Sequence, residues 1–136
     1  MNKMRQYHNV QVMTADKVRL IIMLCEGVIR FNRSAQRSIR EGDIEGRNNF
    51  INRSLAIISE LNSSLNMEEG GEIARNLSSL YEFSTSQLTL ANLKNSAEPL
   101  EVVTNIISEL KAGWECIAGK KAASAPEIEA RSGYGA

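Results

Sequence analysis

Apolar residues recur every three to four positions in four long stretches of this chain, which is the spacing of one face of an α-helix. The first stretch begins at Thr14, a good N-cap residue, and runs to about Glu41, where Gly42 fits a left-handed C-cap. Its apolar face covers about twice the roughly 100° stripe that a surface helix needs. The residues of that face are Val18, Leu20, Ile21, Ile22, Leu24, Cys25, Val28, Ile29, Phe31, Ala35 and Ile39. Such a helix should contact more than one neighbour, and part of its width is available for a partner.

Three further helices are expected over residues 43–66, 71–93 and 96–117, with Asp43 and Ser96 as N-caps. In the second, the apolar stripe starts at Ile44. In the third, the stripe includes Leu80, with Tyr81 at its edge. The glycine pair at residues 70–71 breaks the pattern between the second and third helices.

No run alternates apolar and polar residues with the period of a strand, so the pattern predicts an all-α protein. Four helices of similar length with short connections favour an antiparallel up-down four-helix bundle. We assign residues 14–118 to this bundle. Residues 1–13 are expected to form an N-terminal arm, and residues 119–136, rich in Gly, Ala and Ser, a flexible, disordered tail.

The charges balance, with 16 Lys and Arg against 16 Asp and Glu. A nucleic-acid binder or a polybasic membrane surface would need a basic surplus, so neither partner is expected. No apolar run approaches the length of a membrane span, and the polar N-terminus is no secretory signal, which predicts a cytoplasmic protein. The two cysteines, Cys25 and Cys116, both fall at helical core positions, as expected of buried thiols in a reducing cytosol.

Catalytic and metal-binding patterns are missing from the sequence. His8, on the arm, is the only histidine, and no Cys-x-x-Cys occurs. A di-iron bundle would need inward carboxylates and Glu-x-x-His, whereas the inward positions here are aliphatic. We therefore expect no enzyme activity, metal or cofactor.

Without a catalytic or metal-binding pattern, function is expected to depend on contacts at the surface. Two surface features each allow two interpretations. The wide apolar faces indicate either a well-packed or dimeric bundle, or a groove for a helix or extended peptide of a partner. Four arginines fall together opposite the core face of the first helix, as a solvated ridge or as a patch for an acidic partner: Arg19, Arg30, Arg33 and Arg37.

Three sets of motifs, in this order and spacing, identify a family. The first set is Gln11-Val-Met-Thr-Ala15, Leu20-Ile-Ile-Met-Leu24 and Gly27-Val-Ile-Arg-Phe31. The second is Glu41-Gly-Asp43, Ile58-Ser-Glu-Leu-Asn-Ser-Ser-Leu65 and Gly70-Gly-Glu-Ile-Ala74. The third is Asn76-Leu-Ser-Ser-Leu-Tyr81, Ala91-Asn92 and Trp114. From about Tyr7 to Trp114 the chain resembles the FliS family, the flagellin-specific chaperone of the flagellar type III export system.

The resemblance implies an antiparallel four-helix bundle and a non-enzymatic cytoplasmic chaperone. Such a protein binds the C-terminal segment of flagellin, prevents premature polymerisation and helps to deliver the subunit to the export gate. It also implies an N-terminal arm, matched here by Tyr7 with Val10 and Val12, that packs on the bundle and gives way to flagellin.

We expect the partner to contact residues on the arm and along the edges of the apolar faces, with one polar anchor. The set is Tyr7, Val10, Val12, Leu20, Leu24, Phe31, Phe50, Ile57, Leu61, Phe83, Leu90 and Asn92. The alternative function is a self-associating helical adaptor, or a regulatory module that sequesters another partner, with a homodimer burying the same faces.

Overall fold

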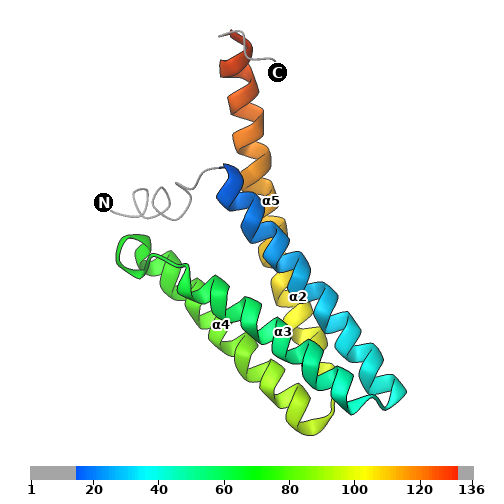
Figure 1. Ribbon diagram of the computed structural model, residues 1–136. Coiled ribbons are helices and arrows are strands. Elements are labelled where there is room, and N and C mark those ends of the chain that lie inside the picture. Colours follow the sequence, from blue (N-terminus) through cyan, green and yellow to red (C-terminus); the bar gives the residue numbers. More distant parts are fainter. Residues whose placement is uncertain (1–14, 132–136) are drawn as a thin grey trace.

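The computed structural model describes residues 15–131, with side chains to residue 119. Four helices follow one another along this range, and it contains no strand: α2 (Ala15–Glu41), α3 (Ile44–Ser63), α4 (Met67–Lys94) and α5 (Glu98–Arg131). Consecutive helices run in opposite directions (Figure 1). The all-α four-helix bundle expected from the pattern is confirmed.

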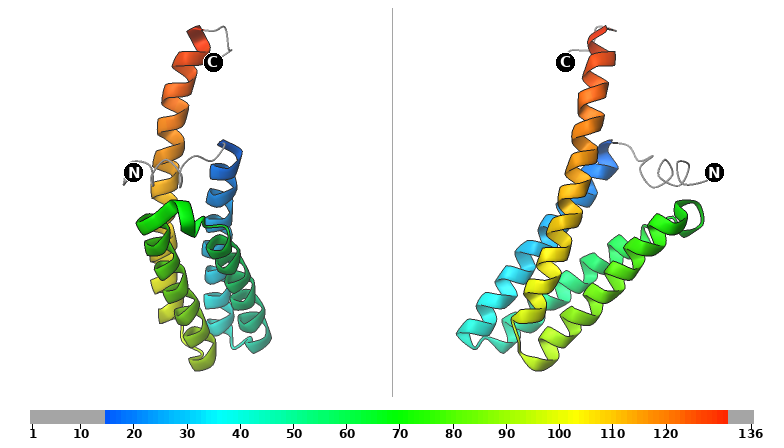
Figure 2. Two further views of the ribbon diagram at one scale, coloured as in Figure 1. Left: turned by 90° about the vertical axis from the view of Figure 1, so that its left-hand side faces the viewer. Right: turned by 180° about the vertical axis from the view of Figure 1, so that it is seen from behind.

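The helices form a ring in which each has two principal neighbours. α2 packs against α3 and α5, and α4 packs against the same two helices, so α2 and α4 lie diagonally opposite. The α2–α5 pair and the α3–α4 pair are close at the end that holds the α2–α3 and α4–α5 connections. They diverge toward the other end, where α5 extends beyond its neighbours (Figures 1 and 2).

Local sequence signals set two of the connections. Gly42 adopts a positive φ of 73°, which glycine tolerates and which ends α2 as expected. The Asp43 carboxylate then accepts a hydrogen bond from the Gly46 backbone N–H at 2.9 Å and caps α3. Before α5, the Ser96 hydroxyl accepts one from the Glu98 N–H at 3.4 Å. The predicted caps at Gly42 and Asp43 are confirmed, whereas α5 begins at Glu98, so Ser96 lies one residue before the position that flanks the helix.

The start of α4 differs from the expectation. The pattern begins this helix near Gly71, but α4 starts at Met67, with Asn66 as its N-cap. Gly71 then adopts φ 57° and ψ −130°, which kinks the helix after its first turn. The glycine break is therefore real, but one helical turn precedes it because the Asn66 side chain accepts a hydrogen bond from the Glu69 N–H at 2.9 Å.

The end of the last helix also differs, because α5 runs to Arg131 rather than stopping near Ile117. The apolar stripe does end where the pattern places it. Alanines are frequent beyond that point, and alanine favours helix without needing contacts. The division into arm, bundle and tail stays a prediction.

The core contains the predicted apolar stripes of all four helices, with two corrections. Tyr81 is only 2% exposed, whereas Leu80 is 38% exposed, so the buried face of α4 is centred on the tyrosine side of the stripe. Ile44 is 64% exposed because it is the first residue of α3, at the end of the bundle. The fully or nearly fully buried apolar residues otherwise include Val18, Cys25, Val28, Ile51, Ile58, Leu61, Leu88, Leu100, Val103 and Ile107.

The two cysteines have different environments. Cys25 is fully buried in the core, and this burial raises the pKa of its thiol to about 11. Cys116 is exposed on α5, so its predicted core position was wrong. Two residues turn an α-helix by about 200°, so Cys116 lies on the side of α5 opposite to buried Trp114.

A polar group crosses the centre of the core. The Asn32 side chain, 0% exposed on α2, donates from Nδ2 to Thr104 Oγ1 on α5 at 3.1 Å. Its Oδ1 accepts from Ser54 Oγ on α3 at 2.6 Å. Because each hydrogen bond joins a different helix to α2, the Asn32 group fixes the relative register of three helices.

Candidate partner-binding surface

Nine of the twelve predicted contact residues fall within the described side chains. The other three, Tyr7, Val10 and Val12, lie outside the described residues. The nine are distributed over three helices: Leu20, Leu24 and Phe31 on α2, Phe50, Ile57 and Leu61 on α3, and Phe83, Leu90 and Asn92 on α4.

An aromatic pair forms the centre of the surface between α2 and α3. The Phe31 and Phe50 rings stack with centroids 6.2 Å apart and an interplanar angle of 25°. The guanidinium carbons of Arg30 and Arg53 each lie 5.7 Å from the centroid of the Phe31 ring. Both aromatic side chains are half-buried, so part of each ring remains open to a partner. A guanidinium group near an aromatic ring is attracted to the negative face of the ring, so the two arginines border the aromatic pair with positive charge.

A close helix contact continues the same surface along α2. A Cβ added at Gly27 would lie 3.0 Å from Ile57 Cδ1, so glycine permits the approach of the two helices there. Leu24 lies about one turn before Gly27 on α2 and is half-buried, and Leu20, about one turn before Leu24, is 52% exposed. We call Leu20, Leu24, Phe31, Phe50 and Ile57 the α2–α3 strip. The structure brings these five predicted residues onto one pair of adjacent helices.

A shallow depression lies at one end of the strip. It has a volume of about 320 Å³ and lies over the first turns of α3. Phe50 and Arg53 line it together with Asp43 and Asn49. An aromatic wall beside charged and amide groups suits a side chain with an apolar body and a polar tip.

Four predicted residues do not join the strip. Leu61 is 2% exposed and belongs to the core. Phe83 is 45% exposed and Leu90 half-buried, but both lie on α4, which is diagonally opposite α2. Leu80 shares the exposed part of α4 with Phe83, so α4 carries apolar surface of its own.

Asn92, the predicted polar anchor, is already engaged within the bundle. Its Oδ1 accepts from Arg47 Nε at 2.8 Å, and its Nδ2 donates to Asn48 Oδ1 at 2.8 Å. Arg47 also donates from Nη1 to Asn95 Oδ1 at 2.7 Å. These bonds join the start of α3 to the end of α4, and Asn92 therefore has a structural role in addition to any contact with a partner.

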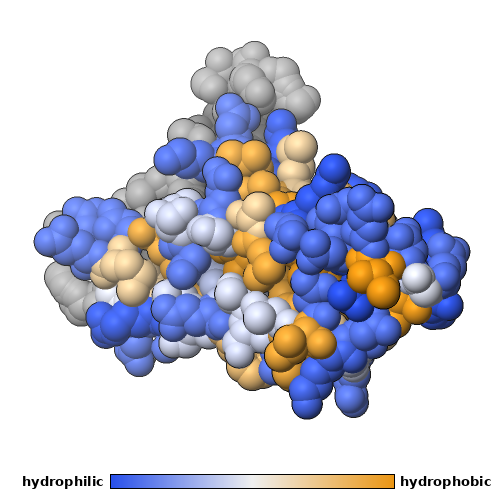
Figure 3. All heavy atoms as spheres, turned by 60° about the horizontal axis from the view of Figure 1, so that its bottom comes forward, coloured by the Kyte–Doolittle hydropathy of each residue, from blue (hydrophilic) through white to orange (hydrophobic). Residues whose placement is uncertain are grey.

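Exposed methionines extend the apolar surface beyond the predicted residues. Met23, three residues from Leu20, is 57% exposed, and Met67 at the start of α4 is 44% exposed. Helical spacing from Leu20 would have found Met23, and a flexible thioether adapts well to a partner. Figure 3 shows apolar atoms in the middle of one face and in smaller patches near its edges, between hydrophilic side chains.

Two further searches concern the described residues only. No three His, Cys, Asp or Glu side chains there are placed to hold a metal ion. None of the helices in that range is both long enough and apolar enough to cross a membrane.

Comparison with known proteins places the chain in a family. The family model described as "Flagellar protein FliS" matches residues 1–121. A Campylobacter jejuni protein named "Flagellar secretion chaperone FliS" is 43% identical over 96 residues, which cover 71% of this chain and 75% of the relative. The protein of the same name from Vibrio cholerae is 36% identical over 107 residues, 79% of each chain. "Flagellar secretion chaperone FliSB" of Pseudomonas aeruginosa is 34% identical over 121 residues, 86% of this chain and 96% of the relative. The chain thus belongs to the FliS family of flagellar secretion chaperones, which are chaperones rather than enzymes.

Proposed function

We propose that this chain is a cytosolic chaperone of flagellin that binds the C-terminal segment of the subunit along the α2–α3 strip. Bound there, the segment is kept from premature polymerisation until the subunit reaches the type III export gate. The observation that supports this proposal best is the stacked Phe31–Phe50 pair in a continuous, partly exposed apolar strip. Membership of the flagellar secretion chaperone family supports the same kind of client.

The proposed mechanism is coupled folding and binding. A disordered client segment loses conformational entropy when it orders on the bundle, and burial of apolar surface offsets that cost. Aromatic side chains near the centre of an interface carry much of its binding energy, so the aromatic pair should act as the anchor. Partly buried anchors limit the area gained, which keeps the complex reversible for release at the export gate.

The N-terminal arm is part of this proposal. Tyr7, Val10 and Val12 would cover apolar surface in the free protein and give way to flagellin. Deleting residues 1–13 should then increase the binding of a hydrophobic dye and change the affinity for flagellin. An unchanged dye signal together with unchanged affinity would mean that the arm covers no binding surface.

Calorimetry with a flagellin C-terminal peptide tests the strip directly. Leu20→Asp places a charge on the strip, whereas Leu93→Asp places one on α4, and both side chains are exposed, by 52% and 79%. We expect Leu20→Asp to weaken binding by about tenfold or more and Leu93→Asp to leave it within about twofold, because only Leu20 would be desolvated in the complex. Equal effects of the two variants would reject the strip as the site.

Self-association remains the second candidate, because exposed apolar residues occur on both α2 and α4. Light scattering separates the two functions. A one-to-one complex with flagellin supports the chaperone, whereas a stable homodimer that does not bind the flagellin peptide supports the adaptor or regulatory module.

A further inference from the structure

A basic depression lies between α2 and α5, on the flank of α2 away from the strip. It has a volume of about 410 Å³, and its walls bring together residues far apart in sequence. Glu26, Ile29, Arg30, Arg33, Ser34, Arg37 and Lys111 line it. Four cationic side chains therefore face one carboxylate.

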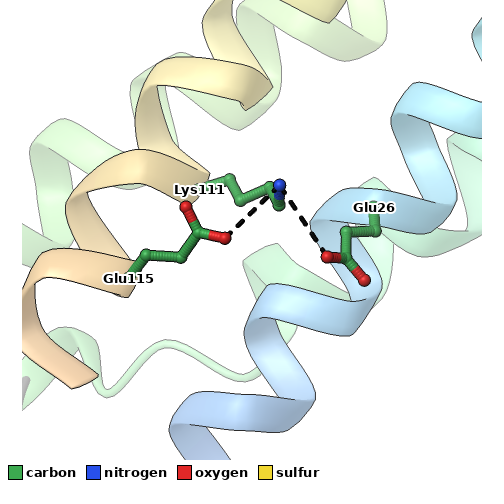
Figure 4. Close-up of polar contacts among 3 residues, drawn as sticks. All are labelled: Glu26, Lys111 and Glu115. Carbon is green, nitrogen blue, oxygen red and sulfur yellow. Dashed lines mark ion pairs between the residues drawn. The ribbon is translucent and has the colours of Figure 1, made fainter. Parts of the chain in front are cut away.

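The single carboxylate is already paired. Lys111 Nζ lies 3.7 Å from Glu26 Oε2 and 3.4 Å from Glu115 Oε2, so the ammonium group is held between α2 and its own helix (Figure 4). Another nearby acid of α5, Glu101, accepts a hydrogen bond from Gln36 Nε2 at 3.0 Å. The acidic groups of this flank thus have partners other than the arginines.

The three arginines form a row along α2. Arg30, Arg33 and Arg37 are spaced by three and four residues, which places them on one side of the helix over about 10 Å. All three are exposed, and no ion pair joins Arg33 or Arg37 to another described residue. Half-buried Ile29 supplies an apolar contact beside the row.

We infer that this α2–α5 depression docks an acidic helical segment of a second protein partner, separately from the client on the strip. Guanidinium groups pair well with carboxylates, and carboxylates three and four residues apart on a helix match the spacing of the row. A compact phosphate would contact one or two of the arginines rather than all three. A nucleic acid would favour a basic surplus that this neutral chain lacks.

The two surfaces lie on opposite flanks of α2, so both can be occupied at once. Phe31 and Leu24 lie on the α3 side of α2, and Ile29 lies on the α5 side. At 100° per residue, the angle about the helix axis between Ile29 and either of the other two is roughly 140° or more. The docking inference does not depend on the identity of the client.

Fluorescence anisotropy tests the inference with the full chain. The probe is a labelled 14-residue helical peptide of alanine and leucine with three glutamates at positions 4, 7 and 11, and its control replaces the glutamates by glutamine. Arg33→Glu with Arg37→Glu removes the free cations, and Arg30 stays unchanged because it also lies against Phe31. The matched control is Arg75→Glu with Lys94→Glu, two exposed cationic residues of α4 outside the depression, which changes the net charge equally.

We expect the Arg33 and Arg37 double variant to weaken probe binding by about tenfold or more and the matched control to weaken it by no more than about twofold. Exchanging glutamate for glutamine in the probe, or raising the salt, should have a similarly large effect because exposed ion pairs are screened. A saturating flagellin peptide should leave probe affinity unchanged.

Three results would overturn the inference. The first is no binding of the probe to the unaltered chain at low salt. The second is an equal loss in both double variants, which would mean attraction to overall charge. The third is displacement of the probe by inorganic pyrophosphate at equal concentration, which would mean a general anion site. Loss of flagellin-peptide binding in the Arg33 and Arg37 variant would instead count against the proposed client site on the α2–α3 strip.

Discussion

Replacing Asn32 by leucine should destabilise the bundle although leucine is apolar and of similar size. Asn32 is fully buried and makes two hydrogen bonds, to Thr104 on α5 and from Ser54 on α3. The substitution removes both bonds and leaves two buried hydroxyl groups, Ser54 at 0% and Thr104 at 4% exposure, without their partner. The cost therefore comes mainly from the groups that remain.

The magnitude follows from those two groups. Each lost hydrogen bond that leaves a buried polar atom unsatisfied costs about 1–3 kcal/mol. Ser54 Oγ also lies 3.5 Å from the Val28 carbonyl oxygen and can turn toward it, which lowers its share. Leucine has a better helix propensity than asparagine by about 0.5 kcal/mol. We therefore expect a loss of about 2–3 kcal/mol in the free energy of unfolding.

A triple variant isolates the cause. Asn32→Leu with Ser54→Ala and Thr104→Val removes the whole polar group, and replacing all partners by apolar residues can be nearly neutral. The triple variant should lie within about 1 kcal/mol of the original chain, more stable than Asn32→Leu alone. Such recovery cannot arise from independent sites, whose effects add.

Urea unfolding measures both variants. Helix loss is followed by circular dichroism, and the packing of the single tryptophan, Trp114, which is 6% exposed, is followed by fluorescence. Coincident transitions justify two-state free energies. With a slope of about 2 kcal/mol per molar, Asn32→Leu should lower the midpoint by about 1 M or more. A change below about 0.5 kcal/mol, or a triple variant less stable than the single one, would refute the reasoning.

Three further predictions concern side chains outside the Asn32 group. Gly46→Ala should destabilise the chain by about 1 kcal/mol, because the added Cβ would collide with the Asp43 carboxylate that caps α3. Gly113→Ala has open space around its added Cβ and should stabilise the chain by up to about 1 kcal/mol. Thermal melts in which both variants shift the melting temperature in the same direction would contradict this. In the folded chain a thiol reagent should modify exposed Cys116 rapidly and buried Cys25 only on unfolding. Rapid labelling that persists in Cys116→Ser would contradict the burial of Cys25. The pKa of Cys25 in the folded chain, about 11, exceeds its ordinary value of 9.0, so its contribution to stability is complete below pH 9 and is lost as the pH rises toward 11. The loss in the free energy of unfolding should be about 2 kcal/mol at pH 10.5. Urea titrations should show that the free energy of unfolding of Cys25→Ala falls less with pH over this interval.

Much of the fold was predictable because its signals are local. The Asp43 cap and the left-handed Gly42 depend on residues within one turn, and both were predicted. The α2–α3 strip was predicted in part, because helical spacing places Leu20, Leu24 and Phe31 at one edge of the apolar face. Stacking of Phe31 on Phe50 was not predictable, because it depends on how far α2 and α3 slide against each other.

Another prediction failed where residues at both edges of an apolar stripe are equally hydrophobic. Leu80 and Tyr81 both border the apolar stripe of α4, and periodicity gives their angles about the helix axis but not the direction of the core. The prediction for Cys116 failed for a different reason: this residue lies about 200° around α5 from buried Trp114, so helical spacing itself places it outside the core face.

By itself the sequence determined four amphipathic helices, their antiparallel order, the caps at Gly42 and Asp43 and the family, since periodicity, capping residues and motifs are properties of the chain alone. Only the tertiary structure decided which residues meet across helices. Asn32 contacts Thr104 across 72 positions, and Lys111 of α5 lines the same depression as the arginine row of α2. The physical reason is that the rotation and sliding of packed helices are set by how all their side chains fit together, and no single helix contains that information.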